Sequence, residues 1–399
     1  MRVAIVHDWL VVSGGAEKVL HQIIECFPEA DIFTLVDFLE DRTCINKRPV
    51  RTSFIQQLPL ARKHYRSYLP LMPIAIEQFD LSGYDLVISS SYAVAKGVLT
   101  GPDQLHISYM HSPIRYAWDL QHQYLNEAGL SKGVKSVFAR ALLHYIRGWD
   151  ARSTNGVDYL IANSHFIARR IRKAYRRDAT VIYPPVDIAA LPARVQKDDF
   201  YLTASRMVPY KRIDLIVKAF SMTPERRLIV IGDGPDMRKV RAAAGPNVSI
   251  LGYQSFEVLR DHLQRARAFV YAAEEDFGIS IIEAQACGTP VITYGRGGAL
   301  ETVIGIPSER ATGVFFKEQT PESLNEAVTR FERNRHAFDP QVCRDNAERF
   351  SREKFKAALR AFIEVQLARS PSETMLDRRA ASRDIAVETG VTEAVASSK

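Results

Sequence analysis

The sequence predicts an α/β protein made of two Rossmann-like domains that face each other across a cleft. First, short apolar runs rich in valine and isoleucine alternate with longer helical patterns, as expected for βαβ units around parallel sheets. Second, this alternation runs in two series, which are separated over residues 183–199 by a stretch with three prolines and no clear period. Third, a chain of 399 residues with 46% hydrophobic content is too long for one small domain and is typical of a two-domain globular protein.

The first series predicts an N-terminal domain over residues 1–187. Segment 51–80 departs from the alternation, because arginines and lysines are interleaved with aromatic and aliphatic residues. It suits either a surface helix packed on the core or an insertion that contacts an interface or an acceptor. The expected strands lie at 2–7, 30–36, 84–89, 105–110, 157–162 and 180–183.

The second series predicts a C-terminal domain over residues 188–345. A helical region from about 321 to 368 closes the fold. Residues 370–399 are expected to be disordered, because they mix small and charged residues without an apolar period. The expected strands lie at 200–204, 227–231, 248–251, 268–272 and 290–294, and the expected helices at 212–221, 235–244, 255–265 and 278–287.

The bulk properties favour a cytoplasmic protein. The N-terminal residues pass at once into a short apolar run broken by charge, which is neither a signal-peptide core nor a membrane span. No stretch reaches the roughly 18 uninterrupted apolar residues of a spanning helix. The four cysteines lie far apart without C-x-x-C spacing, so they suggest neither a zinc site nor a disulfide framework.

The net charge of +7 is unevenly distributed. Between Lys132 and Arg177 there are eleven basic residues and two acidic ones. A solvated helix face is the ordinary explanation, and the alternatives are an anionic membrane surface or an acceptor that itself carries phosphate. No nucleic-acid-reading motif accompanies the charge, so no nucleic-acid partner is expected.

The strongest local pattern is the pair Glu275 and Glu283, which encloses Phe277, Gly278 and Ile279. It follows an expected strand and opens an expected helix, at the edge of the sheet where α/β proteins bind ligands. Gly278 permits a close backbone approach, and free amides at the helix start accept phosphate or sugar oxygens. Each carboxylate can bind paired hydroxyls. Taken singly, the two glutamates are a helix-start charge and an ordinary helix residue.

Arg206 and Lys211 lie between the first strand and the first helix of the second series. Fixed cations at this edge can stabilise the negative charge that develops on a leaving nucleoside diphosphate. Two solvated loop cations are the alternative. Nowhere in the chain are two aspartates separated by a single residue, so the D-x-D handle of metal-dependent sugar transferases is missing. We therefore expect no required metal.

On the N-terminal side, Gly14 and Gly15 precede a helix and let a diphosphate or an acceptor approach its amides. The full G-x-G-x-x-G pattern is missing, which counts against a dehydrogenase. His111 lies at the carboxyl end of an expected strand, where it is a structural histidine, a donor to a sugar hydroxyl or a proton acceptor. His7 and Asp8 share this position at the end of the first strand.

Together these residues resemble the retaining glycosyltransferases of the GT-B fold, family 4 or group 1. The chain is most similar to the bacterial mannosyltransferases of surface-polysaccharide assembly, over about residues 1–366. The resemblance adds the expectation of a C-terminal helix, residues 346–369, that returns to the N-terminal domain. It rests on the glycine pair, His111-Ser112-Pro113, Arg206 with Lys211, Gly232-Asp233-Gly234-Pro235, the two glutamates and Gly288-Thr289-Pro290.

The resemblance implies that a nucleotide-diphospho-sugar binds mainly to the C-terminal domain and the acceptor to the N-terminal one. Glu283 then meets the ribose, Glu275 and His111 lie near the donor sugar, and Tyr253 contacts the base. The implied catalytic residues are His111, Arg206, Lys211 and Glu275, and the implied substrate-binding residues are Gly14, Gly15, Tyr253, Phe277, Gly278, Ile279 and Glu283.

The family also implies transfer of a hexose with retention. GDP-mannose is the favoured donor, from the opening His7-Asp8-Trp9 and the context of His111, and a UDP-sugar is the alternative. The expected acceptor is a saccharide or a polyprenyl-diphosphate-linked glycan, which would bring the basic stretch to the cytoplasmic face of the inner membrane as a peripheral contact. No covalent nucleophile is evident, so we favour departure and attack on one face of the sugar, within one ion pair.

Three rival functions share parts of this pattern. A glycoside hydrolase also uses two carboxylates, but it would leave Arg206 and Lys211 unexplained. A nucleotide-sugar epimerase has the same two-domain architecture and needs no acceptor. A non-catalytic scaffold would bind the nucleotide sugar without turnover.

Overall fold

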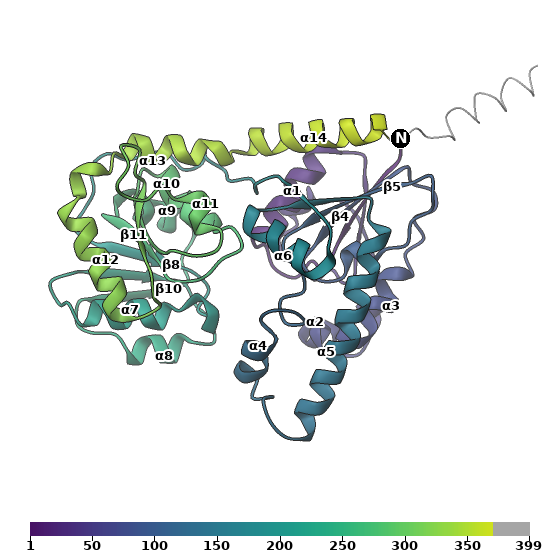
Figure 1. Cartoon of the computed structure of the whole chain (residues 1–399), viewed down its shortest axis with the longest axis horizontal. Helices are drawn as coiled ribbons and strands as arrows, with labels where there is room; N and C mark the ends of the chain where they lie inside the picture. The colour runs from purple at the N-terminus through teal and green to yellow at the C-terminus, as the bar shows by residue number, and fades with distance from the viewer. Residues whose placement is uncertain (370–399) are drawn as a thin grey trace, which may run out of the picture.

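The computed structural model describes residues 1–369 and contains two β-sheets (Figure 1). The N-terminal sheet has seven strands in the order β3-β2-β1-β4-β5-β6-β7, and the C-terminal sheet has six in the order β10-β9-β8-β11-β12-β13. All strand pairs in both sheets are parallel. Helices pack on both faces of each sheet, as parallel sheets require. The predicted pair of Rossmann-like α/β units is confirmed.

The strands of the two sheets follow the chain order. The N-terminal sheet contains β1 (Val3–His7), β2 (Asp31–Thr34), β3 (Val50–Thr52), β4 (Leu86–Ser91), β5 (Leu105–Met110), β6 (Tyr159–Ala162) and β7 (Thr180–Val181). The C-terminal sheet contains β8 (Tyr201–Ala204), β9 (Leu228–Ile231), β10 (Val248–Gly252), β11 (Ala268–Tyr271), β12 (Val291–Tyr294) and β13 (Gly313–Phe316). The sequence pattern predicts neither β3 nor β13. Each lies at an edge of its sheet.

Residues 1–369 contain fourteen α-helices, of which the last three follow the final strand β13. The longer ones are α1 (Gly15–Cys26), α5 (Val134–Ser153), α6 (His165–Tyr175), α7 (Ile213–Ser221), α9 (Phe256–Arg265), α10 (Ile279–Ala286), α12 (Pro321–Arg333), α13 (Pro340–Ala347) and α14 (Arg352–Arg369). The shorter ones are α2 (Ala61–His64), α3 (Met72–Glu77), α4 (Gln121–Glu127), α8 (Met237–Ala242) and α11 (Ala299–Thr302). Among the 3₁₀ helices, η3 (Tyr65–Leu71), η4 (Ala95–Gly97) and η6 (Pro209–Lys211) recur below.

Each domain has its core on both faces of its sheet. In the N-terminal domain, Leu20 of α1 packs on one face and Ile76 of α3 on the other. In the C-terminal domain, Phe220 of α7 and Phe331 of α12 lie on one face and Ile281 of α10 on the other. Because side chains alternate along a strand, burial on both faces explains why the strands read as continuous apolar runs.

The last described helix, α14, joins the core of the N-terminal domain. Its Phe355 and Ile363 pack in the same buried cluster as α1. The ammonium of Lys356 lies 3.1 Å from the carboxylate of Glu25 at the end of α1. In Figure 1, α14 runs from the C-terminal domain along the edge of the molecule to the N-terminal one. The predicted return of the C-terminal helix is confirmed.

Segment 51–80 forms the edge strand β3 and a series of short helical turns, including η3 and α3. Its Ile55, Met72 and Ile76 are buried under the N-terminal sheet, so the segment packs on the core. A role in acceptor binding stays a prediction. The residues from 370 to 399, expected to be disordered, lie outside the described residues. All four cysteines are buried and unpaired. No helix within residues 1–369 is both long and apolar enough to cross a membrane.

Candidate active site

Lys211 and Glu275 form an ion pair at the carboxyl edge of the C-terminal sheet. Lys211 ends η6, which follows β8, and Glu275 follows β11, the strand beside β8. The ammonium of Lys211 donates to the carboxylate of Glu275 and, over 2.6 Å, to the hydroxyl of Tyr271. Burial disfavours the charge on each partner, but the opposite charge outweighs it, so the pKa of Lys211 is raised and that of Glu275 is lowered. Both side chains stay ionised near neutral pH.

The turn between Glu275 and Glu283 brings the two domains together. Gly278 has φ +91°, a conformation that a residue with a Cβ rarely adopts, and it precedes the first residue of α10. A Cβ placed on Gly15 would meet Ile279 at 3.0 Å. The glycine turn before α1 therefore lies directly against the start of α10. The sequence predicts both turns as ligand-binding, and the fold places them side by side.

Glu283 makes an interdomain contact that the sequence pattern does not reveal. Its carboxylate accepts a hydrogen bond over 2.7 Å from the ammonium of Lys18, one turn into α1. Lys18 is half-exposed, whereas the Glu283 side chain is largely buried. An exposed lysine near a helix start looks like a solvated residue in the sequence, and only the approach of α1 to α10 gives it this partner.

Asp276, next to Glu275, is a second meeting point of the domains. Arg170 lies 3.0 Å and Arg115 3.6 Å from its carboxylate, and Ser164 donates to its backbone carbonyl over 2.6 Å. All three partners belong to the N-terminal half. Arg115 follows His111 by four positions, so this contact ties the His111 loop to the Glu275 loop. Sequence reasoning missed Arg115.

Glu301 of α11 adds a third contact between the domains. Its two carboxylate oxygens accept hydrogen bonds of 2.8 Å each from the backbone amides of His165 and Phe166. These amides belong to the first turn of α6, where the helix dipole favours a negative charge. The C-terminal domain thus supplies the acid that satisfies the amino end of a helix in the N-terminal domain.

A chain of hydrogen bonds connects His111 to the glycine turn. Nε2 of His111 lies 2.9 Å from the hydroxyl of Ser90, and the same hydroxyl lies 3.1 Å from Nδ1 of His7. Nε2 of His7 lies 3.4 Å from the carboxylate of Glu17. That carboxylate also accepts the backbone amide of Gly14 over 2.8 Å. The carboxyl ends of β1, β4 and β5 therefore join one polar network.

The network sets the tautomers of its histidines. The carboxylate of Glu17 can only accept, so a neutral His7 carries its proton on Nε2 and accepts from Ser90 at Nδ1. The Ser90 oxygen then accepts from Nε2–H of His111, which leaves Nδ1 of His111 as an acceptor. Burial lowers the pKa of His111 to about 3. His111 is thus a neutral hydrogen-bond acceptor at physiological pH.

Asp8 organises the loop after β4. Its carboxylate accepts four backbone amides, from residues 92, 93, 94 and 95, over 2.6–3.0 Å. These bonds satisfy the oxygens of a fully buried acid and hold the start of η4. Asp8 therefore supports the backbone beside His7, and its oxygens point into the protein.

The remaining predicted residues have different surroundings. Arg206 is exposed in the loop that follows β8 and takes part in none of the ion pairs within residues 1–369. Tyr253 is exposed just after β10. Phe277 is buried, with its ring packed against Tyr183 and Phe350. The Phe277 side chain therefore anchors the turn in the core and leaves its backbone at the site.

Within residues 1–369, two further features bear on the choice of site: possible metal-ligand groups and surface hollows. Within the described part of the chain, no three His, Cys, Asp or Glu side chains are grouped so that they could hold a metal ion. A surface hollow of about 610 Å³ lies between α7 and α12, and the sequence-predicted site residues do not line it. The charged groups at the domain interface remain the candidate site.

Comparison with solved structures identifies the fold. The sucrose-phosphate synthase of Thermosynechococcus elongatus superposes with a TM-score of 0.68 at 17% identity, covering 92% of this chain and all of that one, 100%. HepE from Anabaena, solved in complex with UDP, superposes with a TM-score of 0.66 at 17% identity and the same coverage. At this identity the likeness concerns the fold, which is the two-domain GT-B fold.

Two family models then cover most of the chain. Residues 13–190 match Glycosyltransferase Family 4, and residues 189–351 match Glycosyl transferases group 1. The chain belongs to this family of glycosyltransferases.

Among individual relatives, a GDP-mannose-dependent monoacylated alpha-(1-6)-phosphatidylinositol monomannoside mannosyltransferase from Corynebacterium glutamicum is 29% identical over 203 residues, 43% of this chain. A poly(glycerol-phosphate) alpha-glucosyltransferase from Bacillus subtilis is 28% identical over 202 residues, 46% of this chain. The matches span 52% and 29% of those two relatives. The activities of the relatives therefore bear only on the proposal that follows.

Proposed function

We propose that this protein transfers a mannosyl residue from GDP-mannose, with retention of configuration, to a polyprenyl-diphosphate-linked saccharide. The arrangement of Lys211, Glu275 and Glu283 beside the glycine turn carries the proposal. It joins a cation and hydroxyl-binding carboxylates at one edge of a parallel sheet, where α/β proteins bind nucleotides. In this assignment Glu283 binds the ribose and Glu275 lies beside the donor sugar.

In this mechanism Lys211 and Arg206 assist the breaking of the bond between the donor sugar and the diphosphate. As the bond from the sugar C1 to the diphosphate oxygen breaks, negative charge grows on the diphosphate, and Lys211 and Arg206 stabilise it. The acceptor hydroxyl forms its bond to C1 on the same face, and its proton passes to a departing phosphate oxygen. Nδ1 of His111, held as an acceptor by Ser90, takes a hydrogen bond from a hydroxyl of the donor sugar.

GDP-mannose is proposed over UDP-sugars because the Corynebacterium relative is named for it. The structural neighbour solved with UDP makes a UDP-hexose the specific competitor. The base-side contact proposed for the donor is Tyr253, which is exposed and free to stack on a base.

The test is an assay of transfer from a panel of GDP- and UDP-sugars to a polyprenyl-diphosphate-linked saccharide. Mass spectrometry gives the mass of the product, and the one-bond C1–H1 coupling in its NMR spectrum gives the configuration of the new glycosidic bond. The expected product is heavier by one hexose, forms only with GDP-mannose and keeps the donor's configuration. Transfer from a UDP-sugar alone would overturn the donor. Free mannose without an extended acceptor would favour a hydrolase, and an altered nucleotide sugar without acceptor would favour an epimerase.

A further inference from the structure

Helix α5 carries an exposed apolar stripe along most of its length. Val134 and Phe138 are each 73% exposed, and Val137, Ala141 and Tyr145 are also exposed. At 100° per residue, these positions fall within an arc of about 100° on one side of the helix. A contiguous apolar stripe on the surface of a soluble domain usually marks a contact site.

The other side of α5 is already packed. Leu143 and Ile146 belong to a buried cluster that includes Leu125 of α4, and Trp149 belongs to the core beneath the N-terminal sheet. The helix therefore has two apolar faces, and within residues 1–369 only one of them is covered. In Figure 1, α4 and the first half of α5 form a hairpin that projects from the lower side of the N-terminal domain.

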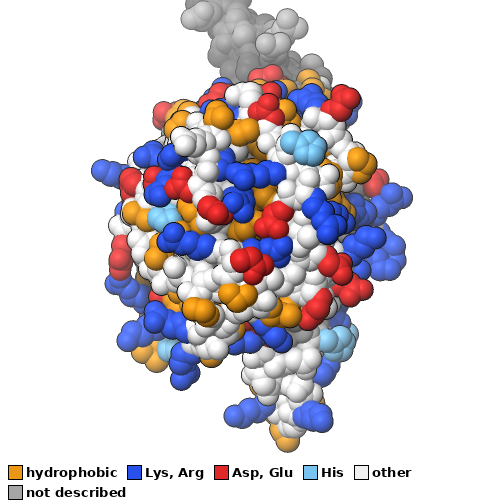
Figure 2. All heavy atoms as spheres, turned by 90° about the vertical axis from the view of Figure 1, so that its left-hand side faces the viewer, with side chains coloured by type: hydrophobic (Ala, Val, Ile, Leu, Met, Phe, Trp, Pro, Cys, Tyr) orange, Lys and Arg blue, Asp and Glu red, His pale blue; other side chains and the backbone are white. Residues whose placement is uncertain are grey.

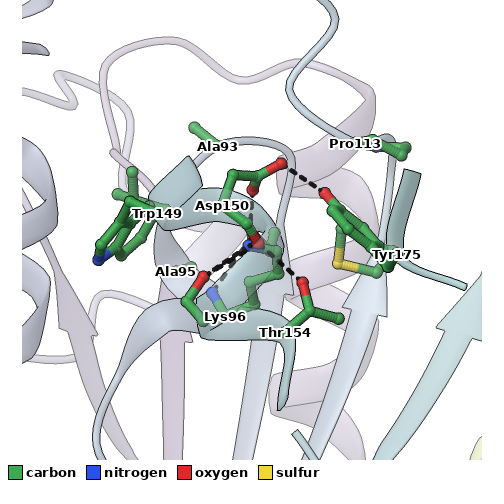
Figure 3. Close-up of polar contacts among 12 residues, drawn as sticks. Ala93, Ala95, Lys96, Pro113, Trp149, Asp150, Thr154 and Tyr175 are labelled. Atoms are coloured by element: carbon green, nitrogen blue, oxygen red, sulfur yellow. Dashed lines mark hydrogen bonds and ion pairs between the residues drawn. The ribbon is translucent and has the colours of Figure 1, made fainter. Parts of the chain in front are cut away.

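The base of this hairpin is clamped by a buried ion pair (Figure 3). The ammonium of Lys96 lies 2.6 Å from the carboxylate of Asp150, and both side chains are 0% exposed. The other oxygen of Asp150 accepts hydrogen bonds from the indole of Trp118 and the hydroxyl of Tyr175. Asp150 thus ties α5 to η4, to α6 and to the loop that leads from His111. These contacts fix the base of the hairpin to the N-terminal domain.

The charged side chains between α4 and the middle of α5 are all basic. No acidic residue occurs from 128 to 149. Lys132, Lys135 and Arg140 are exposed beside the apolar stripe. Figure 2 shows Lys and Arg side chains on either side of the projecting tip and hydrophobic atoms at its end. Apolar side chains flanked by cations fit an anionic bilayer, where the rings enter the boundary of headgroups and acyl chains while the cations meet the headgroups.

A neighbouring segment extends the same chemistry. Leu69 of η3 packs against the same buried cluster as Leu143 of α5. Just before η3, Leu60 is exposed, and Arg62 and Lys63 are exposed beside it. This is the interleaving of basic and apolar residues that the sequence shows over 51–80.

We propose that the α4–α5 hairpin docks this protein on an anionic lipid bilayer, with Val134, Val137 and Phe138 inserted at the surface. The proposal rests on the proposed function only for the choice of a lipid-linked acceptor. His111 and Arg115 lie in the loop between β5 and α4, the segment that leads into the hairpin. Docking through the tip would therefore bring the candidate site close to acceptors that are anchored in the membrane.

The experiment measures co-sedimentation of the full-length protein with vesicles, in the absence of any sugar donor. Vesicles of phosphatidylcholine with about one quarter phosphatidylglycerol are compared with vesicles of phosphatidylcholine alone. We expect binding to the anionic vesicles that weakens as salt is raised. The double substitution Val137→Glu with Phe138→Glu should lower the vesicle-bound fraction at least about tenfold, since it replaces inserted side chains with charges that anionic lipid repels.

A matched control is Val195→Glu, at a position that is 80% exposed outside the hairpin. It should bind vesicles as the wild type does, and circular dichroism should show all variants folded. Equal binding of the hairpin variant and the wild type would overturn the proposal. So would a wild type that forms dimers in sedimentation velocity, loses them on the hairpin substitution and never binds vesicles, because the stripe would then be an interface between copies.

Activity assays separate this inference from the proposed function. The hairpin variant should transfer sugar normally to a short, water-soluble acceptor and poorly to an acceptor embedded in vesicles. Normal transfer by wild type with no vesicle binding would refute the docking surface alone. Vesicle binding without transfer from GDP-mannose would refute the donor assignment alone.

Discussion

Two lysine–carboxylate pairs, one in each domain, differ in how completely the protein encloses them. Lys96 and Asp150 in the N-terminal domain are 0% exposed, whereas the side chains of Lys211 and Glu275 in the C-terminal domain are 15% and 17% exposed. Lys96 and Lys211 each lie in a short 3₁₀ helix that follows a parallel strand, η4 after β4 and η6 after β8. The same chemical pair can therefore act as a structural clamp or as part of a site.

The partners of each pair explain the difference. Lys96 also donates to the Asp150 carbonyl and to Ser153, over 3.0 Å each, and lies 5.3 Å from the ring of Trp149 (Figure 3). Its ammonium is thus surrounded by protein. Lys211 has Glu275 and Tyr271, and the loop of Glu275 continues into the domain interface. The ammonium of Lys96 is surrounded by protein groups and cannot reach a ligand. The ammonium of Lys211 lies at the domain interface, where it can also contact a bound anion.

The largest expected effect is on stability, from Lys96→Met. Removing one member of a buried ion pair leaves an uncompensated charge, so the free energy of unfolding should fall by about 3–5 kcal/mol. Urea denaturation checks this value, and turnover per folded molecule should change little. The double variant Lys96→Met with Asp150→Leu should recover much of the loss, because it removes both charges. A single variant as stable as the wild type would show that the pair is no clamp.

The next effect is on catalysis, from Lys211→Ala or Arg206→Ala. One charged contact to the diphosphate is worth about 1.5–3 kcal/mol, so turnover should fall at least about tenfold. Steady-state kinetics with the donor measures it, and thermal unfolding should show a folded protein. Lys218→Ala, an exposed lysine of α7, is the control with unchanged kinetics. Unchanged rates in both site variants would remove the diphosphate clamp from the mechanism.

The third effect is a dependence of stability on pH that arises from His106, which lies close to Lys96. Burial lowers the pKa of His106 to about 4, and the charges of Lys96 and Arg177 contribute less. As the pH falls below about 6.5, His106 becomes protonated in the unfolded chain but stays neutral in the folded protein. Stability from this group is therefore full above pH 6.5 and is lost down to about pH 4, by up to about 1.4 kcal/mol per pH unit.

The variant His106→Gln should shrink the stability difference between pH 7.5 and pH 5 by about 2 kcal/mol, as measured by urea denaturation at each pH. His64→Gln, at an exposed position, should leave that difference unchanged. An unaltered pH dependence in the His106 variant would mean that the residue titrates normally.

A smaller catalytic effect should follow Ser90→Ala, which removes the hydroxyl that links His7 to His111 by hydrogen bonds. One hydrogen bond is worth about 0.5–1.5 kcal/mol, so activity should fall by about two- to twelvefold. Ser89→Ala is a close control, since Ser89 is the next residue on β4 and bonds the buried His106 over 2.9 Å. It should leave turnover unchanged even where it costs stability. Equal losses of turnover in both variants would point to a general packing effect.

The smallest expected effect is that of EDTA, which should leave activity unchanged if Arg206 and Lys211 supply the positive charge. The measurement is turnover after dialysis against the chelator, with and without added Mg²⁺. Complete loss that Mg²⁺ restores would show that a metal is needed beside the two cations.

The sequence predicted the elements that carry strong local patterns. Most strands are apolar runs, and the glutamate pair with Gly278 stands at a strand–helix boundary, so both were visible. Arg115 and Lys18 were missed because neither belongs to a local pattern. Their partners, Asp276 and Glu283, lie more than 150 positions away in the chain. The edge strands β3 and β13 were also missed.

The amino-acid sequence by itself determined the two α/β series, the glycine turns and the supply of cations and carboxylates, because these depend on local periodicity and residue chemistry. Only the tertiary structure decided which lysine is enclosed and which lies at the interface. It also joined Glu17, His7, Ser90 and His111 into one network, through the pairing of β1, β4 and β5. The physical reason is that burial and the partner of a charge depend on residues far away in sequence, which the fold alone brings within a few ångströms.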